Sequence, residues 1–475
     1  MQRHKHFLNG LLTVSGTTAA IGVALVLMTG CPTPGTADDN ANTSANDNGD
    51  EPDNANAPSD NENATVDNEN DNAPADNEND NGAPEERAFV GAETCMACHA
   101  DTHTGWVASR HASALEALRN IGQEANADCI GCHTVGFGET DGFVDEATTP
   151  GLVGVQCENC HGAAGAHSRD PGNETLRPTV SVSADVCGAC HNDAHHPTIE
   201  EWSLSKHSMA VETIKSHAFG QDVCLACHSQ DYRYAVELQE EDPDVEIPTI
   251  ETAVYSIECV TCHTPHGGLE YEHQLRAPIA NVCGECHTQG EEVLPDNTPH
   301  HPQFEMIIGL GAFQSDGTEA TATHTHSTLV TANGGEACAQ CHVVQHEVEE
   351  PNDGDPNVTG HTFNPFDNAI TAHQAAEYTG CGGCHTAEAA DEKRAALQQE
   401  ITLILLGLAF FFDDAGVGYI DPATLTEAER ALLTVAKFNY QFVSADGSNG
   451  VHNPTYAREL LDIAKTILAN LVDGG

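Results

Sequence analysis

Cys95-Met96-Ala97-Cys98-His99 is the first of nine copies of the pattern Cys-x-x-Cys-His in this chain of 475 residues. The nine copies, numbered here as motifs 1 to 9 in chain order, use eighteen of the nineteen cysteines, and the nineteenth is Cys31. No pair of thiols remains for a disulfide. Motifs 2 to 9 are Cys129-Cys132-His133, Cys157-Cys160-His161, Cys187-Cys190-His191, Cys224-Cys227-His228, Cys259-Cys262-His263, Cys283-Cys286-His287, Cys338-Cys341-His342 and Cys381-Cys384-His385.

The spacing within the motif has a mechanical reason. Two cysteines three positions apart share one face of a helical turn, where their thiols can form thioethers with the two vinyl groups of one porphyrin. The next residue, a histidine, then lies beneath the iron. Zinc sites also use paired cysteines, but they do not require an adjacent histidine, and all nine copies have one. The motifs therefore predict nine covalent c-type haems, with their irons held by His99, His133, His161, His191, His228, His263, His287, His342 and His385.

The composition sets the expected fold class. Aromatic residues make up only 5% of the chain, which is low for a core built from side chains alone, so porphyrins are expected to fill much of the interior. We predict a mainly α fold with extensive loops: short helices carry the motifs around a haem-packed core, a helical segment follows at the C-terminus, and there is little or no sheet. The protein without haem is not expected to fold.

A second histidine on each iron would give bis-histidine coordination, which suits electron transfer without substrate binding. Of 28 histidines, nine are in the motifs and two, His4 and His6, lie near the N-terminus, which leaves seventeen. His103, His195 and His346 each follow a motif histidine by four residues and, on a continuing helix, would point to a neighbouring haem. Exposed surface histidines are the alternative. The distal candidates are His103, His111, His167, His195, His207, His266, His346 and His452.

A longer repeat narrows this choice. Trp106-x-x-Ser109-x-His111 precedes motifs 2 to 4, and Trp202-x-x-Ser205-x-His207 precedes motifs 5 to 7. The two tryptophans are 96 residues apart, which predicts a duplicated three-haem module in which His111 and His207 are equivalent distal ligands. On a helix, residues five apart point about 140° apart, so the tryptophan would pack inward while the histidine reaches a haem. The alternative is a duplicated pair of exposed histidines.

Three stretches of the sequence resemble known multihaem proteins. The run from Gly91 to His111 resembles the tetrahaem cytochrome that accepts electrons from hydroxylamine oxidoreductase, a likeness that implies an axial role for His111. Cys262-His263-Thr264-Pro265-His266-Gly267 is similar to the signature of doubled Cys-x-x-Cys-His proteins, which implies that His266 is axial. The tail from Asp446 to Ala457, which contains His452, is similar to the C-terminal helical segment of multihaem nitrite and hydroxylamine enzymes. The resemblance implies a multihaem c-type cytochrome.

The N-terminus has the pattern of an export signal. Arg3 and Lys5 precede an apolar stretch over residues 7–28, and Leu27-Met28-Thr29-Gly30-Cys31 resembles a lipoprotein cleavage box, with Met28 where leucine is usual. We predict lipidation of Cys31, with an uncleaved N-terminal membrane anchor as the alternative. The predicted segments are a leader (1–31), a disordered acidic tether (32–88), haem modules with four, three and two motifs (89–200, 201–290 and 291–390), and a C-terminal helical segment (391–475).

Helices are expected throughout that last segment. Thr426-x-x-Glu429 is a capping box that opens a helix to about Phe442. Asn453-Pro454 opens another helix, whose apolar stripe consists of Tyr456, Leu460, Ala464, Ile467 and Leu471. The apolar run over residues 401–412 is too short to cross a bilayer, so we expect a buried helix that packs on the haem body or on a second subunit.

The charge limits the choice of partners. A formal net charge of −56 argues against nucleic acid and anionic lipid surfaces, and it favours redox partners, a donor and an acceptor, with basic docking surfaces. The alternative is that the acidic residues only solvate the surface.

The favoured function is an electron carrier tethered in the periplasm or at the cell surface, with no catalytic residue. The alternatives are a multihaem oxidoreductase of nitrogen or sulfur compounds (hydroxylamine, nitrite or tetrathionate) with one open iron, and a subunit that polymerises into a haem filament.

Overall fold

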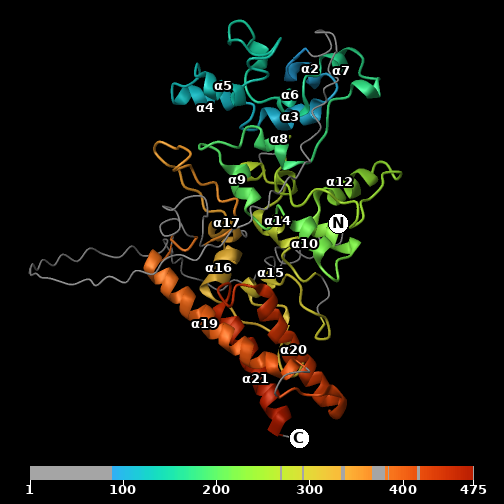
Figure 1. Cartoon of the computed structure of the whole chain (residues 1–475), viewed down its shortest axis with the longest axis vertical. Coiled ribbons are helices and arrows are strands. Elements are labelled where there is room, and N and C mark those ends of the chain that lie inside the picture. Colours follow the sequence, from blue (N-terminus) through green and yellow to red (C-terminus); the bar gives the residue numbers. More distant parts are fainter. Residues whose placement is uncertain are drawn as a thin grey trace, which may run out of the picture. The chain divides into compact units, whose positions relative to one another are not determined.

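The computed structural model describes residues 88–267, 270–290, 294–332, 337–365, 380–382, 384–413 and 418–473, which all belong to one compact unit (Figure 1). The predicted leader, the lipidation site Cys31 and all but the last residue of the predicted tether lie outside these residues. The boundaries between the three haem modules stay predictions.

Short helices carry residues of motifs 1 to 8, as predicted, whereas the described residues of motif 9 lie in a turn before α19. In the first module these are α2 (Ala92–Met96), α3 (Ala100–Val107), α4 (Ala114–Asn120), α5 (Ala127–His133), α6 (Cys157–His161), α7 (Gly165–Arg169) and α8 (Ala184–Gly188). They continue with α9 (Thr198–Ser203), α10 (Ala210–Ser216), α11 (Leu225–His228), α12 (Gln230–Gln239), α13 (Cys259–Cys262), α14 (Ile279–Gly284), α15 (Gln303–Ile308), α16 (Thr325–Ala332) and α17 (Ala337–His342). Single 3-10 turns lie at Pro150–Leu152, Glu174–Leu176, Asp222–Cys224, Glu272–Gln274 and Pro422–Thr424.

Sheet is almost absent from the described residues. One pair of two-residue strands, β1 (Ala312–Phe313) and β2 (Glu319–Ala320), forms an antiparallel ladder in which Ala312 faces Ala320. The prediction of a mainly α fold with little sheet is confirmed.

Side-chain cores in the haem-motif region are small. Leu115 and Leu118 of α4 pack with Ile130 in one buried cluster, and Val211 and Ile214 of α10 pack with Leu225 in another. The α4 residues and the α10 residues are 96 residues apart, which is the same offset as the two tryptophans. Clusters this small leave much of the interior to another group, as the low aromatic content suggested.

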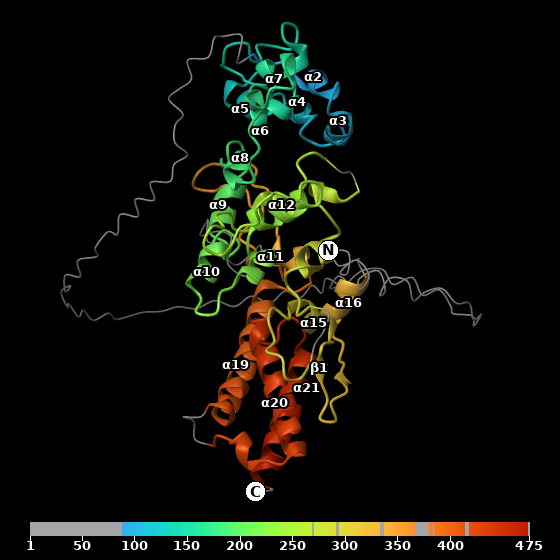
Figure 2. The ribbon, with the colours of Figure 1, turned by 90° about the vertical axis from the view of Figure 1, so that its right-hand side faces the viewer.

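The largest side-chain core lies in the C-terminal helices α19 (Ala387–Phe412), α20 (Glu427–Asp446) and α21 (Pro454–Asp473), which lie side by side (Figures 1 and 2). The predicted capping box of Thr426 and Glu429 is confirmed, although its helix continues past Phe442. The stripe of α21 is buried as predicted from Tyr456 to Ile467, whereas Leu471 is only partly buried.

Residues 401–412 are not a helix buried within the chain, as one form of the expectation had it; packing on a second subunit stays a prediction. The apolar run is the C-terminal half of the 26-residue helix α19, and only 11% of its most apolar window is buried. Ile401 and Leu408 face the core, but Leu403, Leu406 and Phe410 are exposed. The helix is long and apolar enough to cross a membrane, because Thr386 caps it well before the apolar run begins. Core helices of soluble proteins and signal sequences can have the same length and apolar composition.

A second correction concerns the tryptophan repeat. Helix α3 ends at Val107 and helix α9 ends at Ser203, so His111 and His207 lie in the turns that follow and not on the helices of Trp106 and Trp202. The expected helical angle between tryptophan and histidine therefore does not apply.

Candidate haem-binding sites

Six motif histidines face a second histidine from a distant part of the chain. The distances between ring centroids are 6.0 Å for His161 and His266, 6.3 Å for His191 and His111, 5.8 Å for His228 and His301, 6.2 Å for His263 and His361, 6.1 Å for His287 and His207, and 6.1 Å for His342 and His452. A metal bound between two imidazoles, at about 2 Å from each nitrogen, places the ring centres about 6 Å apart. The pairs fit six-coordinate iron.

Hydrogen bonds orient the motif rings. Nδ1 of His133 donates to the carbonyl of Ala114 at 2.8 Å, and Nδ1 of His263 donates to the carbonyl of His273 at 2.8 Å. His161 and His342 make the same kind of bond, to the carbonyls of Thr179 and Phe363. A proton held on Nδ1 leaves Nε2 free to bind a metal, as in other histidine metal sites.

Burial keeps several of the paired rings neutral. It lowers the pKa of His191, His207, His301 and His361 to about 4 in each case, and the neighbouring histidines add to the effect. Neutral imidazole is the form that binds metal.

His452 is the exception among these rings. Burial alone would lower its pKa, but the charge of Asp446 and a hydrogen bond from His452 Nδ1 to that carboxylate raise it instead.

The tryptophan repeat fixes the backbone of two distal candidates. The indole of Trp106 donates to the carbonyl of Val155 at 2.8 Å, and Val155 N–H donates to the carbonyl of His111 at 2.9 Å. In the second module, Trp202 donates to Ile257 at 2.8 Å and Ile257 N–H donates to His207 at 3.2 Å. Trp106 thus holds the segment before motif 3, and Trp202 the segment before motif 6, against the turn that carries the histidine.

Two other partners are held by different means. His266 lies against Gly105 of α3, where a Cβ atom would approach the His266 carbonyl oxygen to 2.4 Å, so only glycine fits. His361 is held by the buried carboxylate of Glu201, which accepts hydrogen bonds from the Thr359 hydroxyl at 2.8 Å and from the backbone N–H of His361 at 2.7 Å.

The structure places the predicted distal candidates in two groups. His111, His207, His266 and His452 each face a motif histidine. His103 lies buried on α3 with its ring 5.3 Å from Trp106, and its Nε2 has no hydrogen-bond partner among the described residues. Buried Nδ1 of His167 likewise has none there.

Two more candidates lie outside helices, so their expected helical placement is wrong. His195 is exposed beside Asp193, and His346 pairs through its backbone with Val358.

Two partners were not singled out from the sequence. His301 and His361 lie 73 and 98 residues beyond the motif histidines that they face. No local spacing marks His361, but His301 belongs to a repeated His-His-Pro sequence. Among the described residues, no histidine ring lies about 6 Å from His99, His133 or His385.

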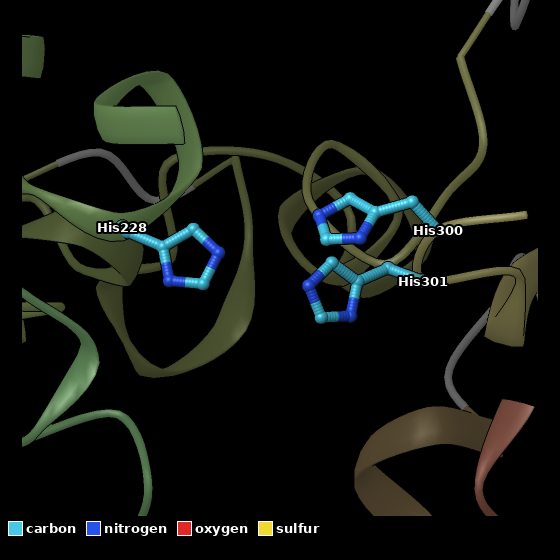
Figure 3. A group of neighbouring side chains, drawn as sticks. All are labelled: His228, His300 and His301. Carbon is cyan, nitrogen blue, oxygen red and sulfur yellow. The ribbon is translucent and has the colours of Figure 1, made fainter. Parts of the chain in front are cut away.

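His228, His300 and His301 form a compact group in which one nitrogen from each ring lies within 4.8 Å of the others. Figure 3 shows the rings of His300 and His301 one above the other, both on the side that faces His228. His301 is the inner of the two, since His300 is exposed.

Contacts between thiols reveal which motifs are neighbours. Hydrogen bonds join Cys95 to Cys157, Cys132 to Cys190, Cys187 to Cys259, Cys227 to Cys286, and Cys283 to Cys338. Weaker electrostatic interactions also relate Cys160 to Cys187, Cys262 to Cys283, and Cys341 to Cys381. Neighbours in space are therefore motifs 1–3, 3–4, 2–4, 4–6, 6–7, 5–7, 7–8 and 8–9.

Two family patterns match parts of the chain. The family described as cytochrome c554 and c-prime matches residues 94–162, and the doubled CXXCH motif matches residues 252–292. Multiheme cytochrome MtrA of Shewanella baltica is 24% identical over 291 residues, which are 56% of this chain and 78% of MtrA. Cytochrome c-554 of Nitrosomonas europaea is 31% identical over 134 residues, which are 22% of this chain and 57% of that protein.

Solved structures share the fold. Outer cell wall cytochrome OcwA aligns with a TM-score of 0.57 at 19% identity, over 80% of this chain and 99% of OcwA. The undecaheme cytochrome from the S-layer of Carboxydothermus ferrireducens aligns with a TM-score of 0.56 at 20% identity, over 82% of this chain and 70% of that one. With the nine motifs and the paired histidines, these likenesses identify the chain as a multihaem c-type cytochrome.

Proposed function

We propose that this protein is a nine-haem electron carrier that passes electrons along a connected row of haems between a donor and an acceptor protein. The observation that carries the proposal is the set of six histidine pairs, each made of one motif histidine and one distant histidine at 5.8–6.3 Å. Bound haem would supply one-electron chemistry at iron. The chain's own residues would attach each haem through the motif cysteines and, at six motifs, would hold two imidazoles toward the iron.

The thiol contacts support an order for the row. Motifs 1, 3, 4, 6, 7, 8 and 9 follow one another as a continuous series, here called the spine. Motif 2 touches only motif 4, and motif 5 touches only motif 7, within the contacts of the described residues; these two are here called the spurs. Because each thiol would attach one porphyrin edge, touching thiols bring neighbouring porphyrin edges together.

Two histidines on an iron leave no position for a substrate, so the six pairs favour a carrier over an enzyme. The oxidoreductase alternative rests on the three motif histidines without a ring partner at that distance, His99, His133 and His385. An electron paramagnetic resonance spectrum of the oxidised protein separates the two functions. A carrier with bis-histidine iron throughout gives only low-spin signals, and an open catalytic iron gives a stoichiometric high-spin signal.

The haem number is tested by the mass of the denatured protein, because thioether-linked haem stays attached. The proposal expects nine haems per chain; a smaller number in the fully matured protein contradicts it. Zinc in place of haem would appear as a metal that is lost on denaturation.

We further propose that the protein is exported and held at a membrane through lipid on Cys31. The pattern of residues 3–31 supports this, as does the acidic stretch that follows, which would extend by self-repulsion and hold the haem body away from the membrane. Cys31→Ser should release the protein from the membrane fraction without changing its haem content. Continued membrane retention of Cys31→Ser points instead to the uncleaved N-terminal anchor.

The net charge of −56 supports docking partners with basic surfaces. Electron exchange with such a partner should slow as ionic strength rises, because salt screens exposed charges beyond about 10 Å at 0.1 M. A rate that does not depend on salt contradicts this part of the proposal.

A further inference from the structure

The chain contains two copies of a His-His-Pro sequence, His195-His196-Pro197 after motif 4 and His300-His301-Pro302 after motif 7. In the second copy, His301 faces motif histidine His228 at 5.8 Å. For the first copy, none of the described histidine rings stands opposite the corresponding motif histidine, His133. The inference below rests on the proposed haem attachment at every motif.

The two copies occupy the same place in their modules. Pro197 and Pro302 are the residues before helices α9 and α15. Ile199 N–H donates to the carbonyl of His191 at 3.0 Å, and Phe304 N–H donates to the carbonyl of His287 at 3.0 Å. The second histidine of each copy also makes the same edge contact with its motif histidine, at 5.7 Å and 66° for His196 and at 6.1 Å and 73° for His301.

Motifs 2 and 5, whose irons the second histidines of the two copies would bind, are equivalent as well. His133 hydrogen-bonds through Nδ1 to the carbonyl of Ala114, and His228 hydrogen-bonds to the backbone of Ala210, which is 96 residues further along the chain. Each spur contacts the last motif of its own module: motif 2 contacts motif 4 through Cys132 and Cys190, and motif 5 contacts motif 7 through Cys227 and Cys286. His301 lies near His228, and His196 likewise lies near His133.

The other two ligand pairs of the module repeat completely. The pair of His161 and His266 at motif 3 corresponds to the pair of His263 and His361 at motif 6. His191 with His111 becomes His287 with His207. Among motifs 2 to 7, the pair that has no counterpart within the described residues is His228 with His301. From this repeat we propose that His196 is the sixth ligand of the motif 2 iron, as His301 is of the motif 5 iron, so that both spurs carry low-spin bis-histidine haem.

The outer histidine of each copy is not the ligand. His195, which the sequence spacing had favoured, lies beside Asp193, and His300 is exposed in the same position. His195 and His196 are both exposed, and what distinguishes His196 is the contact of its ring with the motif histidine His191. The sequence spacing pointed to His195 and not to its neighbour His196, because the segment after motif 4 is a turn and not a continuing helix.

The two turns differ in their backbone. His301 has a φ of +53°, whereas His196 does not have a positive φ. Asp193 Oδ1 accepts hydrogen bonds from the N–H groups of His195 and His196, at 2.8 and 2.9 Å. The first turn is thus capped by Asp193, whereas the second has a left-handed residue at His301.

The test compares His196→Ala with His195→Ala in the full-length haem-loaded protein, beside the matched pair His301→Ala and His300→Ala. We expect His196→Ala and His301→Ala each to convert one haem per molecule from low to high spin, and added imidazole to reverse the change. His195→Ala and His300→Ala should keep the wild-type spectrum. A conversion by His195→Ala, or an unchanged spin count in His196→Ala, overturns the assignment.

A ligand-retaining variant covers the case in which His196→Ala does not mature. His196→Met should keep a low-spin iron but give one haem the absorption of thioether ligation; a purely bis-histidine spectrum overturns the assignment. The haem mass of the wild-type protein separates the two proposals. Fewer than nine haems contradicts the proposed function, whereas nine haems with an unchanged His196→Met spectrum contradicts only the role of His196.

Discussion

The contact between His452 and Asp446 distinguishes the motif 8 site from the other paired sites. Asp446 is buried at the end of α20 and accepts hydrogen bonds from His452 Nδ1 and from the backbone and hydroxyl of Ser448. The corresponding Nδ1 groups of His161, His263 and His342 donate to neutral carbonyls. A carboxylate partner makes the imidazole a stronger donor to iron and thereby favours the ferric state.

Asp446→Asn keeps the shape of this side chain but removes its charge. We expect one haem to become easier to reduce, by about 60 mV if the change in metal affinity is about tenfold. Redox titration of the purified protein measures this shift. Asp316→Asn, which changes an exposed loop carboxylate bonded to Thr318, is the matched control and should leave all potentials unchanged. An unchanged or lowered set of potentials in Asp446→Asn contradicts the role given to the carboxylate.

The equivalence of His111 and His207 gives a second prediction at this scale. His111→Ala should leave the iron of His191 with one histidine, and His207→Ala should do the same to the iron of His287, because these are the rings that they face. Each variant is expected to gain one high-spin haem, and the double variant two. Paramagnetic resonance counts them. Low-spin spectra at normal haem content in both single variants would contradict the pairing.

Sequence reasoning reached part of this site. Motif histidines and cysteines follow from local spacing, and His111, His207, His266 and His452 were found from a repeat or a resemblance. His361 could not be found in this way. Its backbone N–H donates to the carboxylate of Glu201, which lies 160 positions earlier in the chain, and this contact holds His361 near His263. Only the folded chain makes that contact.

At the scale of elements, α19 presents two unlike faces. Ile401 is fully buried against the C-terminal core, while Leu403, only two residues away, is 62% exposed. The apolar composition of residues 401–412 suggested a buried helix, but composition does not determine which side of a helix packs against another element. By contrast, the first residues of α20 and α21 were predicted correctly, because local capping residues determine where these helices begin.

These two residues give a matched pair of variants. Ile401→Ala should lower the free energy of unfolding of the C-terminal segment by about 2–5 kcal/mol, since it leaves a cavity in a packed core. Leu403→Ala should change that free energy by less than about 0.5 kcal/mol. Denaturant titration followed by far-ultraviolet circular dichroism measures both. Equal losses in the two variants would mean that the exposed face of α19 is covered in solution.

At the scale of the whole molecule, the order of the motifs in space differs from their order in the chain. Motif 3 lies between motifs 1 and 4 in the spine, while motif 2 lies to one side on motif 4. The second module repeats this arrangement, with motif 6 in the spine and motif 5 on motif 7. Duplication therefore extended the spine at one end and added a spur each time. The sequence reveals the duplication but not the order, which depends on contacts between thiols far apart in the chain.

The distinction between spine and spur predicts how the loss of one haem affects transport. Removing motif 5 (Cys224→Ala with Cys227→Ala) should leave transfer along the spine intact, because its thiols contact only those of motif 7. Removing motif 7 (Cys283→Ala with Cys286→Ala) should interrupt the spine, because motif 7 alone joins motif 6 to motif 8. Mass measurement confirms that each variant lacks one haem.

The measurement uses an injected electron and a reporter haem. A photosensitiser is attached at position 96, where exposed Met96 lies in motif 1, and His452→Met gives the motif 8 haem a distinct absorption. After a light flash, the reporter should become reduced at the same rate with and without motif 5. Without motif 7, its reduction should be lost on that time scale, since the electron then has no neighbouring haem to cross. Equal rates in the two variants would show that electrons do not follow the order given by the thiol contacts.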